Sequence, residues 1–286
     1  MFISKETDAL LQQFKALADP QRIRVLVLCK AGELSVGELV DVLGQSQPRV
    51  SQHLKLLCAA GLLNRFRDGK RVFYRWPAAP SAAERRLLAA LPEQDPRFDA
   101  DLTLLRNLRT VPVDPNAPPT IDASQRAIAR ALIELTVSTP VGDLLDIGCG
   151  RGRLLKLLAS RARRAVGVDI DSAARSSARA ELFLAGLSNC SLRKGDMYDL
   201  DFEDASFDTI ILDDVLGSAT QPQRVLAEAR RLLRRNGRLL VLQRLGSSNL
   251  EATTAELAPL TASCNLRMTS PRPIPSQQPV WLRWSR

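Results

Sequence analysis

The segment that most constrains this chain of 286 residues is Leu-Leu-Asp-Ile-Gly-Cys-Gly-Arg-Gly, residues 144–152. It reads as an apolar strand that ends at Asp146 and runs into a turn with glycine at three alternate positions, followed by a helix. Glycine lets the backbone approach a ligand closely, and the first amides of a helix are free to donate hydrogen bonds. A second acidic residue, Asp169, closes the next expected strand 19 residues after Gly150, where it can accept the hydroxyls of a ribose. The segment therefore predicts a site for a nucleoside-containing ligand.

Strand-like and helix-like runs alternate from residue 122 onward, which predicts an open, mostly parallel sheet with helices on both faces. A dinucleotide site is the rival interpretation, but its G-x-G-x-x-G turn needs glycine at the position of Arg153. The expected strands are 144–147, 165–169, 191–193, 209–212 and 238–242, followed by 265–272 and 279–285. The expected helices are 153–160, 172–185, 222–235 and 251–263.

Residues 5–76 have a different pattern, in which short helices precede a hairpin. Ser35 and Glu38 have the spacing of a capping box at the start of the second helix. Ser46 is expected to cap the third helix, whose apolar positions repeat on one face. Residues 64–76 then read as a hairpin with Asp68-Gly69 at its turn. The pattern predicts a winged helix-turn-helix.

Positive charge is concentrated in this first module. The chain has a net charge of +9, and residues 1–76 hold 12 basic and 7 acidic side chains, against 28 and 24 in the rest. This surplus predicts binding of a polyanion, with the third helix reading base edges and the hairpin contacting phosphates. The predicted DNA contacts are Ser46, Gln47, Arg49, Ser51, Gln52, Lys55, Arg65, Arg67, Lys70 and Arg71. The alternative is a solvated basic hairpin on a protein–protein module.

The stretches SQPRVSQHLKLL and DGKRVFY together resemble the winged-helix domain of ArsR-type bacterial transcriptional regulators, over residues 5–76. The resemblance implies a repressor that binds double-stranded DNA at a palindromic operator, as a homodimer formed by helices at 7–17 and within 81–108. Metal-sensing members carry cysteines in the segment that corresponds to ELSVGEL, where Ser35 and Gly37 stand here. The five cysteines, at 29, 58, 149, 190 and 264, include no C-x-x-C pair, so no metal site is expected.

Residues 122–286 resemble class I S-adenosylmethionine-dependent methyltransferases, because LLDIGCGRG, Asp169, KGDMYDL and FDTIILDDVL occur in the order of that family. The resemblance implies a Rossmann-like fold with a mostly parallel seven-stranded sheet, and S-adenosylmethionine or S-adenosylhomocysteine as the ligand. In that family the glycine turn holds the methionine portion, the acidic residue after the second strand binds ribose, and an aspartate after the third strand reads adenine. The binding residues implied here are Asp146, Gly148, Cys149, Gly150, Gly152, Asp169, Ile170, Asp196, Met197 and Asp213.

Together these features predict an α/β protein of three parts. Residues 1–78 form the DNA-binding domain and residues 122–286 the methyltransferase-like domain. Residues 79–121 form a helical, proline-rich linker and dimerisation segment, because the stretch 77–120 holds eight of the chain's 17 prolines. No apolar run approaches the ~20 residues that span a bilayer, and the N-terminus lacks a signal-peptide core. We therefore expect a cytoplasmic protein without a membrane partner.

The two halves favour a transcriptional regulator whose methyltransferase-like domain binds S-adenosylmethionine or S-adenosylhomocysteine as an effector. Fusions of this kind resemble bacterial regulators of methionine and methyl-cycle genes, which implies such targets. The alternative is an active small-molecule methyltransferase with an appended DNA-binding or autoregulatory domain. In that enzyme an acceptor or a catalytic group would lie at Asp213, Asp214 or residues 216–218. No catalytic residue can be named from the sequence.

Overall fold

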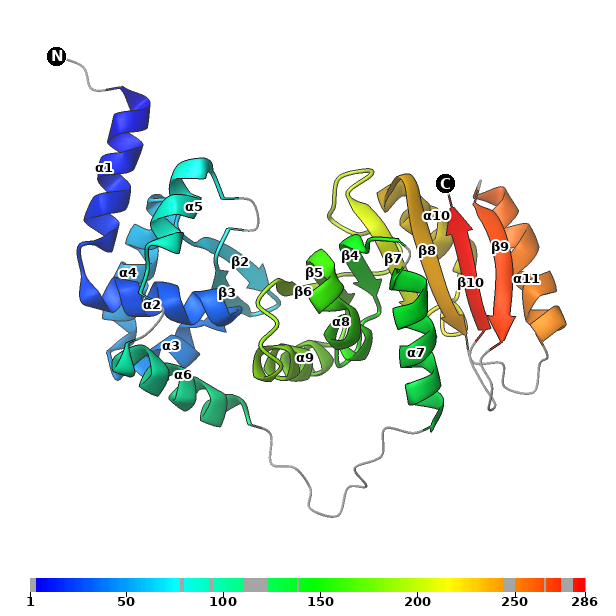
Figure 1. Ribbon diagram of the computed structural model, residues 1–286, viewed down its shortest axis with the longest axis horizontal. Helices are drawn as coiled ribbons and strands as arrows, with labels where there is room; N and C mark the ends of the chain where they lie inside the picture. Colours follow the sequence, from blue (N-terminus) through cyan, green and yellow to red (C-terminus); the bar gives the residue numbers. More distant parts are fainter. Residues whose placement is uncertain are drawn as a thin grey trace. The chain divides into compact units, whose positions relative to one another are not determined.

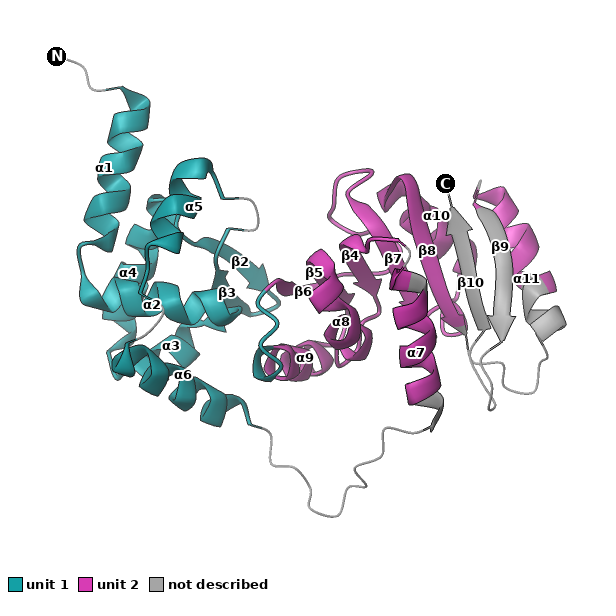
Figure 2. Cartoon of the chain, viewed as in Figure 1, with its two compact units in different colours: residues 1–112, 183–188 teal, residues 113–182, 189–286 magenta. Residues whose placement is uncertain are grey.

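The structure is a computed structural model, and Figure 1 follows the chain through it from the N- to the C-terminus. It describes residues 4–77, 80–92, 95–110, 123–137, 139–243, 250–264, 266–273 and 280–285. The chain divides into two compact units (Figure 2). Unit 1 comprises residues 1–112 with 183–188, and unit 2 comprises residues 113–182 with 189–286.

Unit 1 is a bundle of short helices with a small antiparallel sheet, as the winged-helix prediction requires (Figure 1). The sheet has the strand order β1-β3-β2. The helices are α1 (Lys5–Leu17), α2 (Pro20–Ala31), α3 (Val36–Leu43), α4 (Gln47–Ala59), α5 (Ala82–Ala89) and α6 (Pro96–Arg109). The strands are β1 (Leu34–Ser35), β2 (Asn64–Asp68) and β3 (Arg71–Arg75). The last two helices, α5 and α6, come from the segment that was expected to be a linker.

The starts of α3 and α4 differ in how they are capped. At α3 the Ser35 hydroxyl accepts from the Glu38 amide and the Glu38 carboxylate accepts from the Ser35 amide, which confirms the predicted capping box. At α4 Ser46 occupies the cap position with an extended backbone, but its hydroxyl forms no capping hydrogen bond. The predicted cap residue is therefore confirmed by its position, without the side-chain hydrogen bond of a serine cap. Pro48, at the second helical position, has no N–H to donate to it.

The hairpin of the wing turns one residue later than predicted. Asp68 pairs with Arg71, so the two residues of the turn are Gly69 and Lys70. Gly69 has φ +61°, and glycine at the first central position suits a tight hairpin turn. The two-residue strand β1, in which Leu34 lies opposite Tyr74, was not predicted, because two residues are too few to show an alternating pattern.

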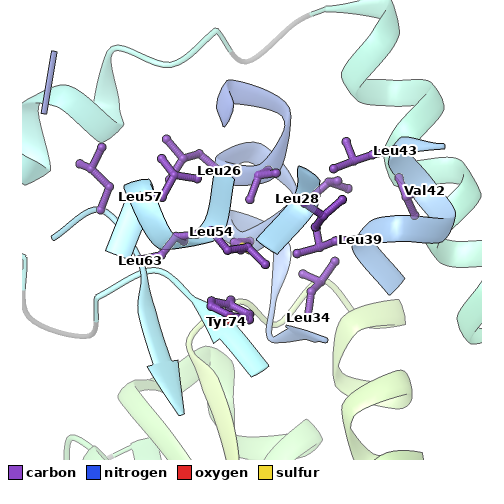
Figure 3. Packing of buried hydrophobic residues seen from close by; sticks show 14 of the residues in the cluster. Leu26, Leu28, Leu34, Leu39, Val42, Leu43, Leu54, Leu57, Leu63 and Tyr74 are labelled. Atoms are coloured by element: carbon purple, nitrogen blue, oxygen red, sulfur yellow. The ribbon is translucent and has the colours of Figure 1, made fainter. Parts of the chain in front are cut away.

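One apolar core holds unit 1 together (Figure 3). From α4, Val50, Leu54 and Leu57 are fully buried, so the apolar face of this helix lies inward as predicted. They pack in the same cluster as leucines of α2, β1 and α3. Leu88 of α5 and Leu105 of α6 are buried in this cluster as well. The two helices that follow the wing are therefore part of the folded module.

Unit 2 contains a seven-stranded sheet in the order β6-β5-β4-β7-β8-β10-β9 (Figure 1). The five adjacent strands β6 to β8 are parallel, and β10 is antiparallel to both of its neighbours, which confirms the predicted mostly parallel sheet. The strands are β4 (Gly142–Ile147), β5 (Ala162–Asp169), β6 (Cys190–Lys194), β7 (Phe207–Asp213), β8 (Leu233–Gln243), β9 (Arg267–Pro273) and β10 (Val280–Ser285). The helices are α7 (Ala123–Val137), α8 (Arg153–Leu158), η1 (Ala159–Arg161), α9 (Ser172–Leu184), α10 (Pro222–Leu232) and α11 (Leu250–Ser263).

Two boundaries in unit 2 differ from the predictions. Helix α8 has only six residues before it tightens into the 3-10 turn η1. Helix α10 ends at Leu232, three residues earlier than predicted, because Leu233 already pairs with Phe207 in the sheet. The predicted strand starts at residues 265 and 279 lie outside the described residues.

Candidate functional site

Four aspartates lie at the carboxyl edge of the parallel sheet. Asp169 and Asp213 are the last residues of β5 and β7, and Asp196 follows β6 by two residues. Asp146 is the penultimate residue of β4, the strand between β5 and β7. The carboxyl ends of strands in an open α/β sheet are the usual place for a ligand. The fold therefore brings the predicted acidic residues to the edge at which a ligand would bind.

Asp146 is the most unusual of these side chains. It is 1% exposed, and its Oδ1 atom has no hydrogen-bond partner among the described residues. Burial raises the pKa of its carboxyl group well above the ordinary value, and the negative charge of Asp213 raises it further. A buried polar atom without a partner is costly. A ligand that donates a hydrogen bond or brings a positive charge would remove that cost.

The glycine turn combines close packing with open space. All three glycines, Gly148, Gly150 and Gly152, have positive φ. A Cβ atom on Gly148 would lie 2.7 Å from the Val215 side chain, and one on Gly152 would lie 3.1 Å from Ala178, whereas one on Gly150 would meet nothing within 4 Å. The turn is thus packed at its two ends and open at Gly150, which leaves room for a ligand at the backbone.

Asp169 is held in place by this turn. Its Oδ2 atom accepts from the Gly150 amide at 2.7 Å, and its Oδ1 atom accepts from the Asp171 amide at 2.8 Å. Each carboxylate oxygen can accept about two hydrogen bonds, so both remain able to accept a hydroxyl. Ile170, the next residue, is 67% exposed and adds an apolar surface beside the carboxylate.

The other predicted residues fall into two groups. Asp196 is exposed and accepts from the Tyr198 amide, while Met197 packs partly against the core of unit 2. Cys149 is buried, and burial raises the pKa of its thiol, so it remains protonated. Cys149 therefore packs the turn from within and does not present a reactive thiolate.

Arg153 lies at this site as well. In the sequence it served only to exclude a dinucleotide site, because that site needs glycine at this position. The Nη2 atom of Arg153 donates to Oδ2 of Asp213 at 2.7 Å, and its positive charge lowers the pKa of Asp146. Arg153 and Asp213 are 60 positions apart in the sequence. The order of the strands in the sheet is the signal that would have indicated the pair, because β4 and β7 are neighbours in it.

The predicted DNA-binding side chains lie on the surface of unit 1. Every one of the polar residues proposed on α4 and at its start is exposed, whereas Val50, Leu54 and Leu57 of the same helix are buried. The four basic residues proposed on the wing are exposed as well. The exposed set is Ser46, Gln47, Arg49, Ser51, Gln52 and Lys55, with Arg65, Arg67, Lys70 and Arg71.

Among the residues that the structure describes, no three His, Cys, Asp or Glu side chains are grouped so that they could hold a metal ion. None of the helices in that part of the chain is long and apolar enough to cross a membrane.

A winged helix with an exposed polar helix and a basic hairpin defines a DNA-binding module, and comparison with known proteins places it in a family. Residues 19–65 match the family "Bacterial regulatory protein, arsR family". The "Arsenic resistance transcriptional regulator ArsR2" of Pseudomonas putida is 39% identical over 103 residues, which cover 35% of this chain and 89% of that protein. The chain belongs to the arsR family of bacterial regulators.

The second unit matches a different family. Residues 145–241 match "Methyltransferase domain". "Nocamycin O-methyltransferase" of Saccharothrix syringae is 38% identical over 119 residues, 40% of this chain and 42% of that protein. A SAM-dependent methyltransferase from Aquifex aeolicus shares the fold, with a TM-score of 0.51 and 15% identity over 57% of this chain and 93% of that one. The chain therefore carries a class I methyltransferase domain after its arsR-type domain. The chain spans about half the length of the first curated relatives that it matches.

Proposed function

We propose that this chain is a transcriptional repressor whose second unit binds S-adenosylmethionine or S-adenosylhomocysteine and thereby changes the DNA affinity of the first. One observation carries the proposal: a DNA-binding module of the arsR family is joined to a unit with a built ligand site, in which Asp146 Oδ1 is buried without a partner. In a regulator, a ligand site of this kind has a use if binding of the ligand is the signal that changes DNA affinity.

The residues at the carboxyl edge suit an S-adenosyl compound. Asp169, which is held by the Gly150 amide, would accept the ribose hydroxyls, and the exposed side chain of Ile170 would pack against the adenine. Asp196 would read the adenine amino group, with Met197 beside the ring. Gly150 leaves space for the chain that joins sulfur to the amino acid. S-adenosylmethionine carries a transferable sulfonium methyl group, which its product S-adenosylhomocysteine lacks.

DNA recognition is assigned to unit 1. Helix α4 enters the major groove with Gln47, Arg49 and Gln52 toward the base edges, and the wing contacts flanking phosphates through Arg67 and Arg71. These side chains are exposed, and the buried face of α4 holds the helix against the core.

The proposed partner of the chain is a second copy of itself. Leu10, Leu11 and Phe14 of α1 are 39%, 42% and 52% exposed, and Leu104 and Leu108 of α6 are exposed too. Apolar side chains gathered on terminal helices are typical of an interaction surface. A homodimer formed by these helices would present two recognition helices to a palindromic operator.

Fluorescence anisotropy on DNA from the region upstream of the gene tests the coupling, with the full chain titrated with each S-adenosyl compound. Allosteric coupling of about 1–3 kcal/mol changes affinity about 5- to 150-fold, so a shift of at least several-fold is expected for one compound. The Asp146→Asn variant should bind DNA but lose the shift. The proposal is overturned if both compounds bind the protein and neither changes DNA affinity. Genes of methionine and methyl metabolism are the expected targets.

A second candidate function is methyl transfer to a small molecule. It is favoured by the similarity to an O-methyltransferase and by Asp214, a non-glycine residue with φ +56° directly after β7 at the ligand edge. Incubation with methyl-labelled S-adenosylmethionine and small-molecule extracts tests it. Incorporation that disappears in Asp146→Ala supports the enzyme, and no incorporation while the ligand still binds rejects it.

A further inference from the structure

An arginine is the largest fully buried side chain among the residues that the structure describes. Arg175, the fourth residue of α9, is 1% exposed, although its guanidinium is always charged and is costly to remove from water. Its Nη1 atom donates to the backbone carbonyl of Asp169 at 2.8 Å. Asp169 is the last residue of β5, so a buried cation contacts this strand at the carboxyl edge of the sheet. An apolar side chain could fill the same place without that cost, which points to a role other than packing.

The contact with Arg175 is one of four hydrogen bonds that hold Asp169. Its carboxylate accepts from the amides of Gly150 and Asp171. Its carbonyl accepts from Arg175 and also from the Gly195 amide, at 3.2 Å. Three of these donors are backbone amides, and the fourth is the guanidinium. The position of Asp169 therefore depends on one side chain, which a substitution can remove without changing the ligand edge itself.

The carbonyl that Arg175 holds belongs to the peptide between Asp169 and Ile170. A peptide unit is planar, so fixing its oxygen also fixes the direction in which the backbone leaves Asp169. The guanidinium is a rigid plane of N–H donors, which makes it suited to hold a carbonyl in one orientation. Rotation of this peptide would turn the Asp169 side chain and Ile170 together. Arg175 thus controls a peptide that carries two of the predicted ligand contacts.

We propose that Arg175 is a positioning residue, which holds the carboxylate of Asp169 in the orientation that accepts the ribose hydroxyls of the ligand. The inference rests on the proposed function, which assigns the ribose to Asp169. Because Arg175 is almost completely buried, it has no surface for the ligand to contact and acts through Asp169. Its removal should therefore weaken compounds that carry the ribose hydroxyls and spare compounds that lack them.

The same helix provides a matched control. Arg179, one turn after Arg175 on α9, is 8% exposed and donates to the backbone carbonyl of Leu192 at 2.7 Å. Leu192 is the middle residue of β6 and not its end. The two arginines share their helix, their burial and their type of contact, but the carbonyl held by Arg179 is not beside a predicted ligand residue. If these arginines only stabilise the fold, both should respond alike to substitution.

Isothermal titration of the full chain with two compounds tests the proposal. One is S-adenosylhomocysteine, and the other is its 2′,3′-dideoxy analogue, which lacks both ribose hydroxyls and should bind the wild-type chain more weakly. Arg175→Met should weaken S-adenosylhomocysteine about ten-fold, because hydrogen bonds to a charged group are displaced, and change the analogue less than about two-fold. Arg175→Lys keeps the charge but not the plane of donors and should weaken S-adenosylhomocysteine about three-fold. Arg179→Met should leave the ratio of the two affinities unchanged.

A double-mutant cycle with Asp169→Asn shows whether Arg175 acts through Asp169. If it does, Arg175→Met should weaken S-adenosylhomocysteine by less than about two-fold in the Asp169→Asn chain. Equal factors with and without Asp169 would overturn the proposal. It is also overturned if a folded Arg175→Met chain keeps the wild-type ratio of the two affinities, or if Arg179→Met changes that ratio as much.

The outcomes separate this inference from the proposed function. If the wild-type chain binds S-adenosylhomocysteine and its dideoxy analogue equally, the inference fails while the ligand site stands. If the wild-type chain binds no S-adenosyl compound, the proposed function fails and this inference fails with it. Circular dichroism verifies that each variant is folded, and Arg175→Lys decides the result by the same ratio of affinities if Arg175→Met does not fold.

Discussion

The carboxyl group of Asp146 connects the ligand site with the stability of unit 2. Burial raises its pKa in the folded protein above the ordinary value of 3.8. The folded state therefore holds the proton more tightly than the unfolded state does. By linkage, the stability associated with this group is full below the ordinary value and is lost as the pH rises toward the raised value.

Asp146→Asn should remove this pH dependence, because asparagine has nearly the same shape and no titrating proton. We expect the free energy of unfolding of the variant to exceed that of the wild type increasingly as the pH rises, by about 1–3 kcal/mol at the upper end. Urea denaturation at several pH values between about 5 and 8 measures the difference. A difference in the free energy of unfolding that stays constant across this range would contradict a raised pKa of Asp146 in the folded protein.

Substitutions at two glycines of the turn should distinguish the effect of packing on stability from the effect of a side chain on ligand binding. Gly148→Ala places a Cβ atom 2.7 Å from the Val215 side chain at φ +71°, so we expect a loss of about 3 kcal/mol in the free energy of unfolding. Gly150→Ala meets no atom within 4 Å and should lose only about 1 kcal/mol, from its positive φ. Thermal denaturation compares the two, and titration with S-adenosylhomocysteine should show that Gly150→Ala still loses affinity.

Among the helices and strands, the end of α6 is hydrogen-bonded to the start of α3, the first helix of the helix-turn-helix. Arg109, the last residue of α6, is buried and donates to the Glu38 carboxylate at 2.8 Å and to the Glu33 carbonyl at 2.6 Å. Glu38 at the same time completes the capping box of α3 with Ser35. The Glu33 side chain forms an ion pair with Arg75 of the wing. One arginine thus connects α6 with the capped start of α3 and with Glu33, whose side chain pairs with the wing.

Arg109→Gln should leave a partly buried carboxylate without its cation and lower the free energy of unfolding by about 3 kcal/mol. Amide hydrogen exchange of α3 is the measurement, because the loss should appear there first. Arg106→Gln, an exposed arginine one turn earlier on α6, should change stability by less than about 0.5 kcal/mol. Similar protection of α3 in both variants would contradict the role of Arg109.

The helix and the wing should respond differently to substitution. Gln47→Ala should relax base preference by about 1–3 kcal/mol, because a contact to a base edge is lost. Arg67→Ala should weaken binding to all sequences alike and flatten the salt dependence by about one unit of slope, because a phosphate contact is lost. Anisotropy on operator and scrambled DNA at several salt concentrations distinguishes them. A uniform loss for Gln47→Ala would show that it contacts the backbone, and Lys156→Ala should have no effect.

What could be predicted from the sequence depended on how far apart the interacting residues are. The capping box at Ser35 and Glu38 and the buried face of α4 follow from spacings of three or four residues, and both predictions are confirmed. The glycine turn was found because its three glycines follow an apolar strand, and Asp169 because it closes the next strand, whereas Asp196 was implied only by the family resemblance. The contacts of Arg109 and Arg153 span 71 and 60 residues, and no local pattern indicates them. The late turn of the wing depends on strand register, which pairing across the hairpin decides.

At the scale of the whole molecule, the exposed face of α1 bears on assembly. Phe14→Glu places a charge on the proposed contact surface, so we expect it to convert a dimer into a monomer and to weaken binding to a palindromic operator at least ten-fold. Light scattering coupled to size exclusion gives the mass. Val137→Glu is the control, because Val137 is 72% exposed on α7 of unit 2 and should remain dimeric. A wild-type monomer that binds the operator would reject the dimer.

The position of Arg109 along the chain has a consequence for the proposed coupling between the units. It is the last residue of α6, and the chain continues toward residue 113, where unit 2 begins, within a few residues of it. Under the proposed coupling, a displacement of the chain at this point would act on the residue that holds the first turn of α3. Hydrogen bonds depend steeply on distance and angle, so a small displacement is enough to loosen one. Coupling of this kind would need no rearrangement of the core of unit 1, because strain on a few hydrogen bonds at the end of α6 would be enough.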